Sequence, residues 1–332
     1  MKRLRLGFYP YAYARVTVMK GDLIKKDDWK NYMKMGPNEL LRAVSGTYKE
    51  IEKVDAADTT SLEIALNRSM MNTFAKLNRI SDEKLQKVIQ LYAQRYDVEN
   101  IKTIIRGKIS QISNEEITQL MLPSLNYDTS FFSDLIKKET AHAVIAALPF
   151  DIDVPKSSDD EMFVIDNLLD RHYMELLAGL STALRGQGKA FRSFIDAERN
   201  ILNVKTIMRL IQEKTKQEDI QHYIILPSPD ITELAKSATI KELAAALHKK
   251  GLIENMPHAA TESELCTELE IALDTTLLKK ESLLMHQHPL TVSVMLGFML
   301  LKEIEVRNLK VVLKGKLLGL NTQQIERLVV AA

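Results

Sequence analysis

The chain has 332 residues, of which 45% are apolar and 27% charged, and its 45 basic and 44 acidic side chains leave a formal net charge of +1. This composition excludes wholesale disorder, and the charge balance provides no overall field that would hold nucleic acid or an anionic membrane. Glycine and proline are scarce, so the turn residues that many short strands need are missing and the sequence favours helices.

The cysteine content and the apolar stretches bear on the compartment. A single cysteine, Cys266, excludes a disulfide framework and a thiolate zinc cluster, and fits a reducing cytoplasm. The basic start, residues 1–5, is followed by no continuous apolar region, so no signal peptide is expected. The most apolar stretch, residues 290–301, is shorter than the roughly 20 residues that a bilayer span needs. We therefore expect no transmembrane span.

In chain order, the first distinctive element is residues 62–67, where leucines four apart mark one face of a helix. The second is residues 97–106, whose apolar positions lie at −2, +1, +4 and +5 relative to Asn100. That spacing is again helical. Ile117 follows the asparagine by 17 residues, and a Leu-Pro-Ser sequence follows at 122–124.

These elements return twice at nearly constant spacing. The leucine pattern recurs at 165–170 and 269–274, and the asparagine pattern at 200–209 and 305–314. The asparagines, at positions 100, 203 and 308, are 103 and 105 residues apart, and an isoleucine again follows each by 17 residues. Leu-Pro-Ser also recurs, at 226–228. Four sequence features thus recur at nearly constant distances from one another, which is best explained by an internal repeat of domain size.

The repeat predicts an all-α fold of three similar helical-bundle units, residues 1–123, 124–227 and 228–332. Each unit is expected to hold about four to six helices. Three copies of this size suggest a funnel about a pseudo-threefold axis, although the repeat alone also permits a linear stack.

Helix-start signals follow the first and third asparagine segments. Ser113 with Glu116, and Asn321 with Gln324, have the spacing of capping boxes and predict a fresh helix there. The second copy has Lys216 at this place, which predicts a weaker cap.

The usual signatures of catalysis and metal binding are missing from the sequence. Its seven histidines are scattered, without an HExxH pattern or a Cys/His cluster, so we expect no metal site. Residues 185–189 faintly resemble a phosphate-binding loop, but Ala183 and Ala190 stand where the motif needs Gly and Ser or Thr, so a helix-to-helix turn is favoured. The acidic pair at 159–160 is expected to be a solvated loop, and Cys266 a core residue. No catalytic residue and no cofactor is predicted.

Basic residues recur at i and i+4 after each repeat asparagine, which places each pair on one helix face. We call these six residues the basic stripe: Lys102, Arg106, Lys205, Arg209, Lys310 and Lys314. The favoured interpretation is a solvated face or pairing within each unit with the Asp97-type position. The sharper hypothesis is a ring of basic groups that binds a partner.

Several of these segments carry a resemblance. Residues 96–108, from Tyr96 to Lys108, are similar to the signature of the C subunit of archaeal A-type ATP synthases, a family that includes the d subunit of V-type ATPases. Residues 13–24, 46–48 and 62–68 resemble the family's N-terminal part, and residues 305–309 resemble its C-terminal pattern. The resemblance covers the whole chain, and residues 140–165 depart from it most.

The resemblance implies three helical domains in a funnel about a pseudo-threefold axis. It also implies a cytoplasmic, peripheral subunit that sits on the membrane proteolipid ring and receives the end of the central shaft made by the D and F subunits. Its role would be mechanical, since the ring, this subunit and the shaft turn together and drive nucleotide exchange in a separate catalytic head.

Two other functions stay open at this point. One is a helical scaffold of a different assembly, against which the long repeat spacing argues. The other is a nucleotide hydrolase that uses the loop at 185–189.

Overall fold

The computed structural model describes residues 4–52, 54–55, 58–154, 161–186, 188–257 and 259–330. The prediction of an all-α fold is confirmed, because the described strands are only β1 (Leu4–Leu6) and β2 (Leu184–Gly186), a short parallel pair in which Leu4 lies opposite Leu184. The helices are α1 (Pro10–Gly21), α2 (Lys26–Tyr32), α3 (Pro37–Ser45), η1 (Lys49–Ile51), α4 (Thr59–Arg79), α5 (Glu83–Ile109), α6 (Asn114–Leu120), α7 (Thr129–Ile136), α8 (Ala141–Ala146), α9 (Glu161–Ala183), α10 (Gly188–Gln212), α11 (Gln217–Tyr223), α12 (Pro229–Leu234), α13 (Ile240–Lys249), α14 (Glu262–Gln287), α15 (Val292–Leu317) and α16 (Thr322–Leu328).

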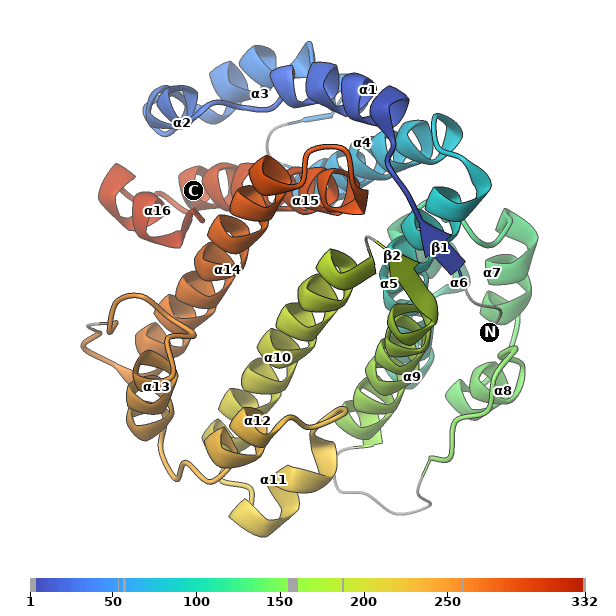
Figure 1. The fold of residues 1–332 in the computed structure, drawn as a ribbon, viewed down its shortest axis with the longest axis vertical. Coiled ribbons are helices and arrows are strands. Elements are labelled where there is room, and N and C mark those ends of the chain that lie inside the picture. Colours follow the sequence, from blue (N-terminus) through green and yellow to red (C-terminus); the bar gives the residue numbers. More distant parts are fainter. Residues whose placement is uncertain are drawn as a thin grey trace.

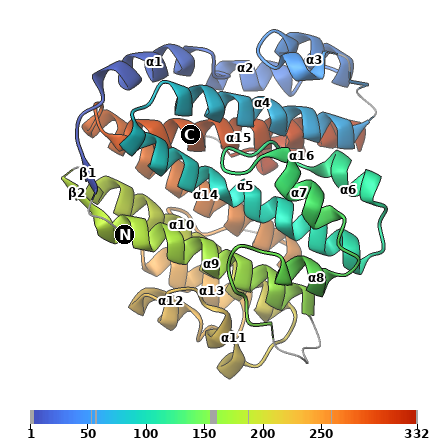
Figure 2. The ribbon, with the colours of Figure 1, turned by 90° about the vertical axis from the view of Figure 1, so that its right-hand side faces the viewer.

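Six long helices, of 21 to 27 residues each, form the body of the molecule (Figures 1 and 2). Each packs against the next in chain order, from α4 through α5, α9, α10 and α14 to α15, and α15 packs back against α4. The order of contacts is therefore a closed ring. A linear stack would leave α15 and α4 apart, so the contacts rule that alternative out.

The short helices at the start of each predicted unit pack against the long helix that ends the preceding one. Helices α7 and α8 contact α5, α12 and α13 contact α10, and α1 and α3 contact α15. Figure 1 shows α1, α2 and α3 along one edge above α4 and α15, with α11 and α12 at the opposite edge. Packing thus crosses the predicted limits at 123 and 227, and the division of the chain into three units stays a prediction.

The repeat asparagines have one structural role in all three copies. The side chain of Asn100 donates to the carbonyl of Leu122 at 2.9 Å and accepts from the backbone N–H of the same residue at 2.9 Å. Asn203 makes the same pair of bonds with Ile225, and Asn308 with Val330, at 2.8 to 3.0 Å. Each clamp ties a long helix to the segment 22 residues later. All three asparagines are buried.

Capping follows the sequence signals. Helix α6 begins with a capping box made by Ser113 and Glu116, and α16 with one made by Asn321 and Gln324. Lys216 makes no side-chain cap at α11. All three predictions about these helix starts are confirmed.

The core continues from unit to unit. One cluster of buried apolar side chains extends from α1 through α9 and includes most of α15. A second unites the C-terminal half of α10, helices α12 and α13, and the first half of α14, with the thiol residue Cys266 among its buried members. No helix of the described residues combines the length and apolar character that crossing a membrane demands.

Residues 185 and 186 lie in strand β2, which was not foreseen, and residues 188 and 189 begin α10, so the segment at 185–189 leads from α9 into α10 as a helix-to-helix connection. Gln187 and the acidic pair at 159–160 lie outside the described residues.

Candidate functional site

The lysines of the basic stripe reach from one repeat to the next. Lys102 contacts Asp170 at 2.5 Å, and Lys205 contacts Asp274 at 3.4 Å. Lys310 donates to the side-chain oxygen of Asn67 at 2.5 Å. The three acceptors occupy equivalent places, at the end of the upstream leucine segments. Each lysine therefore joins its own repeat to the following one, and the third joins back to the first.

The outer members of the stripe are more exposed. Arg106 pairs with Asp166 at 2.7 Å, and Lys314 pairs with Glu63, so these two contacts also run to the following repeat. Arg209 pairs with Glu213 in its own helix at 2.8 Å. The side chains of the three basic residues are 47%, 50% and 47% exposed, which leaves them reachable from solvent.

Pairing with the Asp97-type position, one form of the favoured interpretation, is not what the structure has for the first copy. Asp97 is buried and accepts a hydrogen bond from Asn126 at 2.7 Å, while Lys102 turns to Glu99 and Asp170. The reason is geometric, since Asp97 lies on the face of α5 that holds the segment after α6.

The electrostatics of Lys102 and Lys310 differ with their partners. Burial lowers the pKa of Lys102, but the carboxylates of Asp170 and Glu99 outweigh it and the net pKa is raised. Burial also lowers the pKa of Lys310, and there the net shift is downward. Its acceptor Asn67 is a neutral amide, which explains why the burial is not offset.

These residues border an opening inside the helix ring. A cavity of about 350 Å³ is lined by five of the long helices, α5, α9, α10, α14 and α15, with Lys205 and Asp274 on its wall. A second cavity of about 300 Å³ lies between α4, α5 and α15, with Lys310 and Lys314 on its wall. The two cavities share Tyr96, Glu303 and Arg307. We call these two neighbouring cavities together the interior space. Half of the basic stripe, Lys205, Lys310 and Lys314, lines it.

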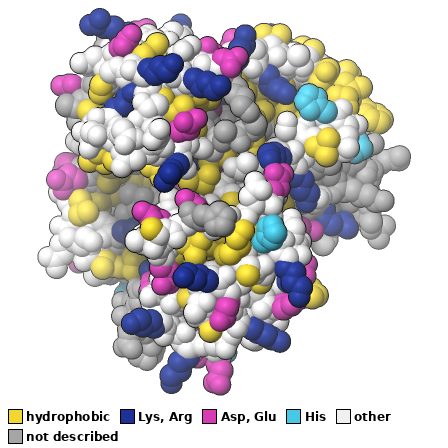
Figure 3. Space-filling view, turned by 90° about the vertical axis from the view of Figure 1, so that its left-hand side faces the viewer, with side chains coloured by type: hydrophobic (Ala, Val, Ile, Leu, Met, Phe, Trp, Pro, Cys, Tyr) yellow, Lys and Arg dark blue, Asp and Glu magenta, His cyan; other side chains and the backbone are white. Residues whose placement is uncertain are grey.

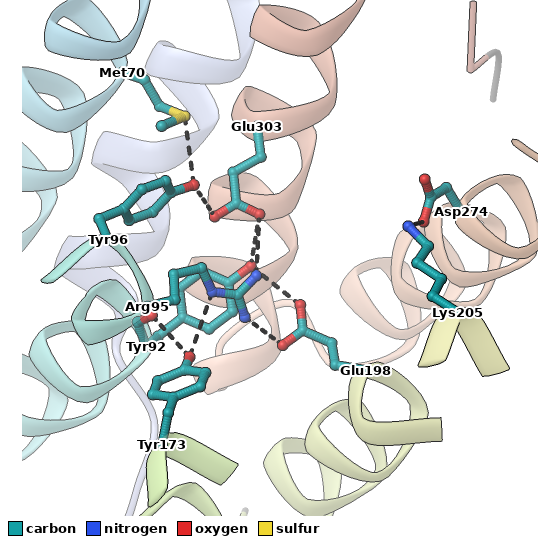
Figure 4. A network of polar contacts seen from close by, with 9 residues as sticks. All are labelled: Met70, Tyr92, Arg95, Tyr96, Tyr173, Glu198, Lys205, Asp274 and Glu303. Carbon is teal, nitrogen blue, oxygen red and sulfur yellow. Dashed lines mark hydrogen bonds and ion pairs between the residues drawn. The ribbon is translucent and has the colours of Figure 1, made fainter. Parts of the chain in front are cut away.

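Three charged residues that line the first cavity meet one another (Figure 4). Arg95, Glu198 and Glu303 each stand five residues before a repeat asparagine, so they are equivalent positions of the three repeats. The guanidinium of Arg95 lies 2.5 Å from the Glu198 carboxylate and 3.6 Å from that of Glu303. We call these three residues the axial cluster. It joins α5, α10 and α15.

Tyrosines complete the axial cluster. Tyr92 and Tyr96 donate to the Glu303 carboxylate at 2.9 and 2.5 Å. Tyr173 donates to the Tyr92 carbonyl at 3.0 Å, and the Arg95 guanidinium lies over the Tyr92 ring at 4.0 Å. Burial raises the pKa of the Tyr173 hydroxyl, so it stays protonated and serves as a donor. These groups hold the two carboxylates in fixed places.

The axial cluster was missed from the sequence. A lone charged residue in a helix reads as solvated, and nothing local distinguishes Arg95, Glu198 or Glu303 from its neighbours. The signal that could have found them is the repeat register, because all three copies carry a charge at the same position.

A second cluster of buried polar side chains joins the N-terminal region to α15. Lys302 contacts Glu305 at 2.7 Å and the Tyr48 hydroxyl at 2.9 Å, and Tyr48 donates to Glu305. The other oxygen of Glu305 accepts from the backbone N–H of Ile24 at 2.5 Å. Two segments on which the family resemblance rests, residues 46–48 and 305–309, are thereby in direct contact.

The surface charges are mixed, and the acidic and imidazole side chains are dispersed among the described residues. On the face shown in Figure 3, basic and acidic side chains are interspersed. Within the described ranges, no group of three or more His, Cys, Asp or Glu side chains is placed to hold a metal ion. The candidate site is therefore an interior space with charged walls.

Known proteins similar to this chain agree on one family. The sequence model of the family described as ATP synthase (C/AC39) subunit matches residues 12–328. The C subunit of the A-type ATP synthase of Methanococcoides burtonii is 30% identical over 96% of this chain and 92% of its own length. The protein of the same name from Archaeoglobus fulgidus is 30% identical over 96% and 95%, and that of Methanocaldococcus jannaschii 25% over 99% and 88%. The chain belongs to the ATP synthase (C/AC39) subunit family.

Proposed function

We propose that this subunit of an A/V-type ATP synthase is a non-catalytic central-stalk piece that couples the membrane proteolipid ring to the rotor shaft. Its partners would be the proteolipid ring and the D and F shaft subunits, at the cytoplasmic face of the membrane and peripheral to it. Ion flow would turn the ring, this subunit would turn with it, and the shaft would carry the torque to a separate catalytic head.

The observation that supports this role is the closed ring of contacts among the six long helices. A coupling piece must transmit torque without yielding, and close-packed helices have low compressibility. Closure matters because torque on an open stack would act on its weakest end contact. Here every repeat is held on both sides, by Lys102, Lys205 and Lys310 in turn.

The interior space, which is lined by Lys205, Lys310 and Lys314 of the basic stripe, is the proposed seat of the shaft. The inner lysines are committed to contacts between repeats, so we assign them to holding the ring closed. The half-exposed Arg106, Arg209 and Lys314 are assigned to contact with the shaft. Basic groups near a docking mouth steer and orient an acidic partner surface.

Charge reversal tests this assignment. The triple variant Arg106→Glu, Arg209→Glu and Lys314→Glu should bind a purified D–F shaft more weakly, while its Tm changes little. The small stability change is expected because exposed ion pairs contribute only about 0–1 kcal/mol each. A matched control reverses three exposed lysines elsewhere, Lys84, Lys137 and Lys241.

Calorimetric titration with the shaft would supply the affinities, and cross-linking in a reconstituted ring–shaft assembly would locate the contacts. Shaft affinity equal to that of the control would remove the three residues from the interface. Failure of the unmodified chain to join either ring or shaft would remove the coupling role itself.

A further inference from the structure

Outside the axial cluster, the acidic and basic side chains around the first cavity balance one another. The acidic groups there are Glu99, Asp170 and Asp274. Lys102 pairs with the first two at 3.0 and 2.5 Å, and Asp274 is contacted by both Lys205 and Arg307. Three basic groups thus meet three acidic ones, and this part of the wall needs nothing from outside.

The charges within the axial cluster do not balance. Two carboxylates, Glu198 and Glu303, share the single guanidinium of Arg95. Arg95 sits within hydrogen-bond distance of Glu198, whereas its nearest approach to Glu303 is 3.6 Å. The hydroxyls of Tyr92 and Tyr96 solvate Glu303 but bring no positive charge. The axial cluster itself is therefore one positive charge short, since Lys310 and Arg307, which line the second cavity with Glu303, contact Asn67 and Asp274 instead.

A third carboxyl group lies near this cluster. Glu281 of α14 is 1% exposed, and its electrostatic neighbours include Glu198 and Lys280. Within the described residues its Oε1 atom has no hydrogen-bond partner. Glu281 therefore brings no positive charge to the axial cluster, and its neighbour Lys280 is exposed to solvent.

An uncompensated carboxylate away from water is costly, so a cation that reaches it is held strongly. The Glu303 side chain is 14% exposed and lines both cavities, so a group that enters either cavity can reach it. We propose that the axial cluster is a socket for one basic side chain, an arginine or lysine, carried by the partner segment that enters the helix ring. This inference rests on the proposed coupling function and names the chemistry of the shaft's contact.

The surroundings favour a guanidinium over a metal ion. The rings of Tyr92 and Tyr173 already lie at 4.0 and 5.9 Å from the Arg95 guanidinium, so a second planar cation would find aromatic faces beside it. Across the described part of the chain, no third acidic or imidazole group joins the two carboxylates in a metal-binding set. One bound side chain would also fix the rotational register of shaft and subunit, because the three repeats differ at this position.

Glu303→Gln separates binding from folding. The variant should bind a purified D–F shaft at least about tenfold more weakly, since truncating one partner of a buried charge pair is costly to affinity. Its Tm without the shaft should be unchanged or higher, because an uncompensated charge has been removed. Glu303→Asp, which keeps the charge, should retain most of the affinity. Glu115→Gln, on the exposed start of α6, is the matched control for the loss of one negative charge.

Salt provides an independent readout, because the affinity of the unmodified chain should fall more steeply with ionic strength than that of Glu303→Gln. An unchanged affinity in Glu303→Gln would overturn the socket, and so would an equal loss in Glu303→Asp, which would show that shape and not charge matters. Glu198→Gln repeats the test if the first variant does not fold. If the unmodified chain fails to bind the shaft at all, the fault lies with the proposed function and not with the socket.

Discussion

Each repeat asparagine closes a long loop with two hydrogen bonds at a buried site. The backbone groups of the partner residue are buried at Ile225 and Val330 and partly buried at Leu122, so loss of the asparagine side chain leaves two such groups without their partner. An unsatisfied buried group costs roughly 1–3 kcal/mol. The contribution of a clamp is therefore larger than that of an ordinary surface hydrogen bond.

The variants Asn100→Ala, Asn203→Ala and Asn308→Ala should each lower the free energy of unfolding by about 2 kcal/mol or more. Urea denaturation with circular dichroism measures this change. Asn72→Ala is the matched control, because its exposed bond to Glu50 should contribute far less. A loss at only one of the three positions would show that the clamps are not equivalent.

Glu281 is the residue most out of place in its repeat. The equivalent positions, counted from the leucine segments, hold Phe74 and Leu177, which are fully buried. Burial raises the pKa of Glu281 to about 8. The folded state then holds a proton that the unfolded state has released, so stability is present at low pH and is lost as the pH rises from about 4.5 to about 8.

Glu281→Gln removes this dependence. At pH 8 the variant should be more stable than the unmodified chain by a few kcal/mol, because each unit of pKa shift corresponds to about 1.4 kcal/mol. At pH 4.5 the two should be nearly equal. Thermal or urea unfolding across this range provides the measurement, with Glu115→Gln as an exposed control. A constant stability difference at all pH values would mean that Glu281 does not titrate in this window.

At the scale of elements, the repeats reuse one helix junction with local changes. Ile117 and Ile325 pack so closely on Gly107 and Gly315 that an added Cβ would lie 2.5 and 2.8 Å from them. The second repeat has Leu210 at the equivalent place and a start of α11 without a side-chain cap. The middle junction is therefore built differently, which agrees with the weaker cap signal in its sequence.

The sequence predicted features that depend on spacing along one chain segment: the helical character of the repeated segments, the caps of α6 and α16, and the common register of the three asparagines. It could not predict which repeat each lysine would contact. Lys102 and Asp170 are far apart in sequence, and their meeting depends on which repeat lies next in the ring. For the same reason Arg95, Glu198 and Glu303 gave no local sign that they would converge.

At the scale of the whole molecule, the repeats are interleaved. The short helices of one repeat cover the long helix of the preceding one, and α15 of the last repeat packs on α1, α3 and α4 of the first. The contact of Tyr48 with Lys302 and Glu305 is buried and spans more than 250 residues. Contacts of this kind make the ring one cooperative body.

Removal of residues 228–332 tests this cooperativity. The fragment 1–227 loses α14 and α15, so Tyr48 and the apolar faces of α3 and α4 are exposed and α10 lacks a neighbour. We expect the fragment to show no sharp unfolding transition and little protection from hydrogen exchange, even in α5. Co-expression of residues 228–332 as a separate chain is the matched control, since it returns the missing helices without the covalent link and should restore protection. If fragment 1–227 alone unfolded sharply at nearly the Tm of the full chain, the repeats would be autonomous domains, and torque would pass between them through contacts that are not needed for folding.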